Sequence, residues 1–285
     1  MSSISLTASM RSNLLSLQGP AELMSKTQER LASGKKVNSA IDNPSSYYTA
    51  QSLNNRASDL SNLLDSMGQA ISTIKAANEG IEAITSFVEQ AKAVANSAAE
   101  ATTAAERGTY GKQFDQLVEQ IDKLASDSGY KGINLIGGAG TTLTVNFDET
   151  GTNKLQIASK NGTAEGIGLV AEGAAPNAAE TAWGNATLAT GATAIAASIT
   201  AAGTAISNLR SMASEFGNNY SIVQTREEFT TNLINVLEEG ADKLTLADMN
   251  EESANMLALQ TRQQLAINSL SLASQASQSV LRLFS

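Results

Sequence analysis

The sequence predicts a mainly α protein: a long antiparallel helical rod, of coiled-coil or bundle type, with paired terminal helices and a small β-hairpin. Apolar residues recur every seven positions over two long stretches, as they do in coiled-coil helices. The 285 residues include only 3 prolines and 4 % aromatic residues, which favours long helices with small side chains between them. A short central segment alternates apolar and polar residues on both sides of a turn, which is typical of a hairpin.

The first segment, residues 1–42, is predicted to be the N-terminal half of a helical domain. Its apolar positions run from Met10 to Leu31 at a spacing of seven. Gly34 then provides a helix stop, and Asp42 or Asn43 can cap the next helix. Pro44 suits the first helical position, since its missing N–H is not needed there.

Residues 43–135 are predicted to hold the N-terminal helices of the rod. The long helix carries a heptad seam, and Thr103–Glu106 reads TAAE, a capping box that opens a third helix. A second long helix is predicted over 188–243. The seam residues of the two long helices are Leu53, Leu60, Met67, Ile74, Ile81, Val88, Leu209, Phe216, Val223 and Leu237.

Residues 136–187 differ from the rest of the chain. Thr141–Phe147 and Lys154–Ala158 alternate around DETGTN and predict the hairpin. Lys160–Thr187 is rich in Gly, Ala, Asn and Thr and contains the only tryptophan, Trp183. We interpret that stretch as a loop or exposed surface segment.

Residues 244–285 are predicted to be the C-terminal half of the helical domain begun by 1–42. Neither terminal helix has a large apolar face, so each is expected to order only when paired or assembled. The expected packing set is Met10, Leu14, Leu17, Met24, Leu31, Leu259, Ile267, Leu270, Val280 and Leu283.

Composition argues against several function classes. The chain has no Cys and no His, which removes thiolate chemistry, the usual general base and the commonest metal ligand. We therefore expect no enzyme activity, no cofactor and no metal site; Asp115, Glu119 and Asp122 are interpreted as a solvated helix face. A net charge of −9 argues against nucleic-acid binding. No Sec signal peptide and no membrane insertion are expected.

Three stretches carry a family resemblance. Leu31–Tyr48 reads LASGKKVNSAIDNPSSYY, Gly132–Gly137 reads GINLIG, and Ala247–Phe284 is a Gln- and Ala-rich segment that closes on VLRLF. Together, and in this order, they resemble the bacterial flagellins. Because only residues 159–187 separate the hairpin from the second long helix, the chain resembles a short form without large outer domains.

The resemblance implies a structural subunit that polymerises with itself into the flagellar filament for swimming motility. It also implies export through the flagellar type III apparatus, with an export chaperone and a filament cap as further partners, and an extracellular location. Flagellins often carry O-glycans, for which Thr142, Thr144, Thr150, Thr152 and Thr163 are candidates. A hook–filament junction protein is the alternative function, and a cytosolic coiled-coil scaffold is a more distant one.

One departure bears on immune recognition. Flagellins detected by the innate immune receptor carry an Arg, then Glu and Leu, ahead of Ala-Asn-Ser. Here Ala95–Ser97 matches, but Val88 stands at the Arg position and Gln90 at the Leu position. Receptor binding is therefore not expected.

Overall fold

The chain is mainly α-helical with a small β component. The computed structural model describes residues 8–138, 140–171, 173, 177–184 and 188–283; the side chains of 8–14, 16–17, 188, 277–278 and 280–283 lie outside this description. The chain divides into two compact units. Unit 1 is Met1–Ala57 with Asn235–Ser285, and unit 2 is Ser58–Ile234. Both long helices run through the division, whereas the five segments expected from the sequence remain a proposal.

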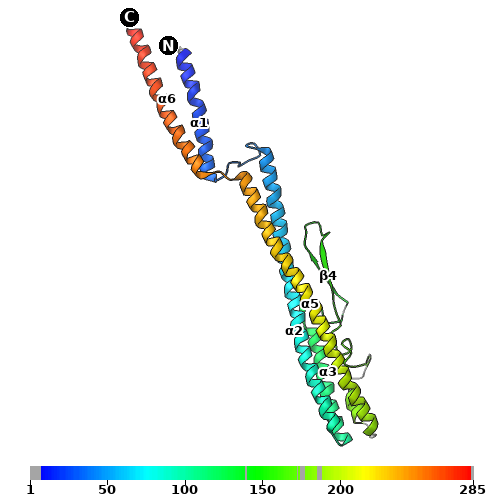
Figure 1. Cartoon of the computed structure of the whole chain (residues 1–285). Coiled ribbons are helices and arrows are strands. Elements are labelled where there is room, and N and C mark those ends of the chain that lie inside the picture. The colour runs from blue at the N-terminus through cyan, green and yellow to red at the C-terminus, as the bar shows by residue number, and fades with distance from the viewer. Residues whose placement is uncertain (1–7, 139, 172, 174–176, 185–187, 284–285) are drawn as a thin grey trace. The chain divides into compact units, whose positions relative to one another are not determined.

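The order of the long helices is as predicted, with one short helix added (Figure 1). The helices are α1 (Ala8–Ser33), α2 (Pro44–Glu100), α3 (Ala104–Asp127), α4 (Ala178–Trp183), α5 (Leu188–Thr245) and α6 (Met249–Leu283). The strands are β1 (Gly129–Tyr130), β2 (Ile133–Asn134), β3 (Thr142–Asn146) and β4 (Lys154–Ala158).

Local side-chain bonds explain where two of these helices begin. Ser46 donates its backbone N–H to Asn43 Oδ1 at 3.1 Å, just ahead of the Pro44 start of α2. At α3, Thr103 accepts from the Glu106 N–H and the Glu106 carboxylate accepts from the Thr103 N–H, so the predicted capping box is confirmed. Each bond satisfies a donor that the first helical turn would leave free.

Unit 2 has a continuous hydrophobic core between α2, α3 and α5. The seam of α2 and the seam of α5 both face this core, together with Phe114 and Ile121 of α3. Of the ten seam residues singled out in the sequence, Leu53 is half-buried and the other nine are buried. The small size of many core residues, such as Ala77, Ala91 and Ala202, lets the helices approach closely.

The predicted hairpin is present as β3 and β4, which pair antiparallel with Leu143 opposite Ile157 and Val145 opposite Leu155. Leu143, Val145 and Ile157 are buried and join the core of unit 2, while the alternate residues of both strands are exposed. A smaller ribbon of β1 and β2, which we did not predict, turns at Lys131 and Gly132, both with positive φ.

The interpretation of 160–187 as a loop or exposed surface segment was wrong in part, because the stretch contains the helix α4 and contributes buried side chains to the core. In the described part of this stretch, Ala164, Ile167, Leu169, Ala179 and Trp183 are buried and belong to the core of unit 2. The Trp183 ring lies 5.0 Å from the Phe114 ring of α3, centroid to centroid. The segment therefore covers the helices instead of projecting from them.

Acidic side chains of α3 hold this segment in place. Asp115 accepts from the N–H groups of Ala179 and Glu180 at 3.1 and 2.8 Å, and so caps α4 from another helix. Asp122 accepts from the Ala164 N–H at 2.8 Å. Burial raises the pKa of the Asp115 carboxyl, although its two backbone donors act in the opposite direction. Our interpretation of Asp115 as solvated was therefore wrong, since this residue is half-buried, whereas Asp122 and Glu119 are exposed as expected, and Glu119 pairs with Lys123.

Candidate assembly surface

The two ends of the chain are joined in unit 1 by backbone hydrogen bonds. Gly34, at a φ of 69°, ends α1 and turns the chain towards the α5–α6 connection. Lys36 N–H donates to Thr245 O at 2.7 Å, and Ala247 N–H donates to Gly34 O at 3.0 Å. These bonds join the α1–α2 connection to the α5–α6 connection. The end of α1 and the start of α6 therefore lie close together, and the two helices pack against one another (Figure 1).

The α1–α6 contact includes a partly buried ion pair. Arg30 Nη1 lies 2.7 Å from Glu252 Oε1, and the Glu252 side chain is only 8 % exposed. Thr27, three residues before Arg30 on α1, is also buried. A buried ion pair adds little net stability, but removing one partner leaves a costly unpaired charge. The pair therefore favours one pairing of these helices over slipped alternatives.

Asp42 stabilises the turn that follows α1. Its carboxylate accepts from the N–H groups of Asn38 and Ser39, and Lys26 of α1 lies 3.3 Å away. The backbone donors of Ser39 and Asn38 are the main reason that the pKa of Asp42 is lowered. The turn of the LASGKKVNSAID stretch is thus organised around this carboxylate.

The structure places the expected packing residues of the terminal helices in different environments. Leu259 is buried, Met24, Leu31 and Leu270 are half-buried, and Ile267 is 53 % exposed. The side chains of the other five members lie outside the described residues: Met10, Leu14, Leu17, Val280 and Leu283. Their role stays a prediction.

Sequence reasoning missed a second apolar face on α6. Leu257, Leu265 and Leu272 are 66, 62 and 67 % exposed. Their spacing of eight and then seven places them on one side of the helix. At 100° per residue, Leu259 and Leu270 lie about 160° around the helix from these three leucines, on roughly the opposite side. The helix thus presents one apolar face to α1 and another to solvent.

Exposed apolar side chains are concentrated in unit 1. Among the described residues of unit 2, Ile222 and Phe229 are the large apolar side chains that are exposed. In unit 1 the corresponding residues are Leu15, Leu23, Ile41, Tyr48, Val236, Leu246, Met249, Leu257, Leu265, Ile267 and Leu272. Exposed apolar surface on this scale marks an interaction site. Unit 1 is therefore the candidate assembly surface.

Family comparisons match both halves of the chain. Residues 2–141 match the bacterial flagellin N-terminal helical region, and residues 199–284 match the bacterial flagellin C-terminal helical region. Flagellin FljK of Caulobacter vibrioides is 30 % identical over 285 residues, which cover 100 % of this chain and 99 % of the relative. The chain belongs to the bacterial flagellin family.

Other relatives agree over the full length. Flagellin of Brucella melitensis is 30 % identical over 292 residues, and Flagellin C of Rhizobium meliloti is 28 % identical over 324 residues; each alignment covers 100 % of this chain and 99 % of the relative. Flagellins are structural proteins that polymerise into the extracellular flagellar filament. This flagellin is accordingly a structural subunit of a filament and belongs to a non-enzymatic family.

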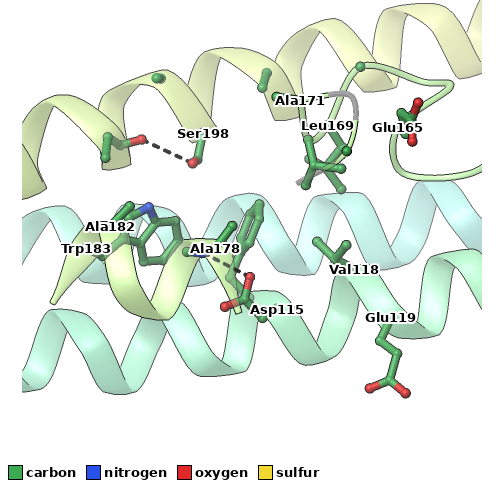
Figure 2. Close-up of a pocket in the computed structure, with 18 of the residues that line it drawn as sticks. Asp115, Val118, Glu119, Glu165, Leu169, Ala171, Ala178, Ala182, Trp183 and Ser198 are labelled. Atoms are coloured by element: carbon green, nitrogen blue, oxygen red, sulfur yellow. Dashed lines mark hydrogen bonds between the residues drawn. The ribbon is translucent and has the colours of Figure 1, made fainter. Parts of the chain in front are cut away.

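A pocket of about 610 Å³ lies in unit 2 of this flagellin (Figure 2). It lies between α3, α4, α5 and residues 165–171 and 173, and its walls include Phe114, Val118 and Trp183. Carboxylates surround it, but within the described residues no group of three or more acidic side chains is arranged to hold a metal ion.

By length and composition alone, the α5 helix is long and apolar enough to cross a membrane, since its most apolar 18 residues have a mean hydropathy of 1.3. The sequence led us to expect no membrane insertion, and one helix that passes on length and composition is weak evidence against that expectation. Core helices of water-soluble proteins meet it too, and α5 buries Ile195, Leu209 and Phe216 in the core of unit 2. The absence of membrane insertion stays a proposal.

The candidate threonines for O-glycosylation are not equivalent. Thr142 and Thr144 lie on the exposed face of β3. Thr150 and Thr152 are exposed in the hairpin turn and share a hydroxyl–hydroxyl bond of 2.8 Å. Thr163 is half-buried, and its hydroxyl donates to Asn161 Oδ1 at 2.6 Å. Accessibility therefore favours Thr142 and Thr144 over Thr163.

Proposed function

We propose that this flagellin polymerises through the apolar faces that its paired terminal helices leave exposed. The observation that carries the proposal is the outward face of α6, with Leu257, Leu265 and Leu272 each more than 60 % exposed. Since α1 already covers the opposite face of α6, the remaining partner is another copy. Burying one such leucine is worth about 1.5–3 kcal/mol, so a few per subunit can drive association.

Leu265→Asp tests the proposal. The side chain is 62 % exposed, so the substitution should leave the folded monomer intact and abolish polymerisation, because a charge would have to be buried between copies. Gln260→Asp is the matched control: it places the same charge at an exposed position of the same helix, about 140° around the helix from Leu265. Sedimentation and electron microscopy measure polymer, and circular dichroism measures the fold. Normal filaments from Leu265→Asp would contradict the proposal.

We also propose that the subunit leaves the cell through the flagellar type III apparatus without a Sec signal peptide. An export chaperone and a filament cap are further proposed partners. Terminal helices that order only on pairing support this route, since an exported chain must travel unfolded. A secretion assay tests it: loss of the flagellar export apparatus should leave the chain inside the cell. Export that continued without the apparatus would contradict this route.

Immune-receptor binding is not part of the proposed function. Val88 stands where detected flagellins carry Arg, and its side chain is fully buried in the core of unit 2. A buried valine offers no cation to a receptor surface. A receptor-binding assay with the purified flagellin should therefore give no signal.

A further inference from the structure

Two features of unit 2 are open to solvent in the part of the chain that the structure describes. One is the pocket between α3, α4 and α5, which has an apolar floor and an acidic rim (Figure 2). The other is an exposed apolar ridge on α5, made by Ile222 and Phe229, which are 37 and 57 % exposed. Because they are one heptad apart, both project from the same side of α5.

The ridge and the rim carry complementary charges. The rim carboxylates of the pocket are Asp115, Asp122 and Glu165, whereas the carboxylate of Glu119, which also lines the pocket, pairs with Lys123. Arg226 lies between Ile222 and Phe229 along α5, and its guanidinium stacks 5.2 Å above the Phe147 ring. Glu227 and Glu228 directly precede Phe229 in the sequence, but they lie about 160° and 100° away from it around the helix. The charge next to the Phe229 ring is therefore positive.

Geometry prevents the ridge from filling the pocket of its own chain. The pocket wall on α5 includes Ala197 and Ser198, whereas the ridge ends at Phe229 on the same continuous helix. At 1.5 Å per residue the two sites are about 45 Å apart. A ridge and a pocket at different places on one subunit make a head-to-tail contact, which forms an open helical filament when its rotation does not close a ring.

We propose that Phe229 of one copy enters the pocket of the next copy, with Arg226 facing the acidic rim. The pocket volume of about 610 Å³ accommodates an aromatic ring. This contact rests on the proposed function, because it requires the flagellin to polymerise. It adds a second interface, within unit 2, that gives the polymer its direction.

A cysteine cross-link tests the contact directly, because the natural sequence has no Cys. Phe229→Cys and Ala197→Cys are introduced together, and filaments are oxidised under mild conditions. The two thiols cannot meet within one chain, since a rigid helix separates them. Neighbouring copies should therefore link into a ladder of covalent multimers on a non-reducing gel.

Gln224→Cys with Ala197→Cys is the matched control. Gln224 is also exposed on α5, but it lies about 140° around the helix from Phe229. This pair should give no ladder. Filaments that form but give no ladder with the first pair, or an equal ladder with both, would overturn the contact and leave the proposed function intact. Failure of the unaltered chain to polymerise would instead overturn the proposed function.

A second variant covers the case in which the cysteine chains do not assemble. Ala197→Phe fills the pocket and should raise the critical concentration for polymerisation at least about tenfold. Ala196→Phe makes the same change at the neighbouring exposed position, which does not line the pocket, and should have little effect. Equal behaviour of the two variants, each with an unchanged circular dichroism spectrum, would overturn the contact.

Discussion

At the scale of single residues, one carboxylate of α3 caps the short helix α4. Asn177 precedes α4 but makes no side-chain capping bond, and Asp115 of α3 supplies both acceptors instead. A helix of 6 residues is too short to be stable alone, so the cap and the burial of Trp183 hold it together.

Asp115→Ala should lower the free energy of unfolding of unit 2 by about 1–2 kcal/mol, because two backbone donors lose their acceptor. Urea titration followed by fluorescence is a direct measurement, since the only tryptophan lies on α4. The control is Glu119→Ala, which removes only a surface ion pair with Lys123 and should cost less than about 0.5 kcal/mol. Equal losses in the two variants would contradict the capping role.

The lowered pKa of Asp42 predicts acid sensitivity of the turn after α1. A carboxyl whose pKa is lower in the folded state stabilises that state above its unfolded pKa, and this contribution is lost as the pH falls through the folded value. The 34–43 turn should therefore loosen below about pH 4. Hydrogen exchange of the Asn38 and Ser39 amides between pH 5 and 3 measures this loss, and Asp42→Asn should remove its pH dependence. An identical pH profile for that variant would contradict the assignment.

At the scale of helices, the close approach of α3 and α4 depends on glycine. A Cβ at Gly111 would lie 2.6 Å from Ala179 O, a contact with backbone that no side-chain rotation relieves. Gly217 of α5 has nothing within 4 Å of the corresponding position. The two glycines therefore respond differently to the same substitution, although both lie inside helices.

Gly111→Ala should destabilise unit 2 and displace α4, whereas Gly217→Ala should raise the free energy of unfolding by about 0.5–1 kcal/mol through helix propensity. Thermal unfolding followed by circular dichroism compares the two variants, and the near-ultraviolet signal of Trp183 reports on α4. Stabilisation by both substitutions would mean that α4 does not pack as closely as described.

The sequence predicted the long helices, their seams, the capping box and the hairpin, because each depends on residues close together in the chain or on a regular spacing. It could not predict α4, whose cap comes from Asp115 more than sixty residues earlier. Glycine, alanine and threonine in 160–187 have weak local preferences, so composition alone favours a loop there. The outward face of α6 could have been found, since Leu257, Leu265 and Leu272 follow a helical spacing.

At the scale of the whole molecule, the two units differ in how many large apolar side chains they bury and expose. Unit 2 contains the main hydrophobic cluster and exposes Ile222 and Phe229 as its large apolar side chains among the described residues. Among its described side chains, unit 1 buries few large apolar ones and exposes many. The central claim is that unit 2 folds by itself, while unit 1 needs neighbouring copies to bury its apolar surface.

Electron microscopy of the concentrated intact chain, beside a chain that ends at Asp248 and so lacks α6, tests this claim most directly. The intact chain should form regular filaments. The shortened chain should stay monomeric and keep the cooperative thermal transition of unit 2. Filaments from the shortened chain, or monomers from both, would contradict assembly through the terminal helices.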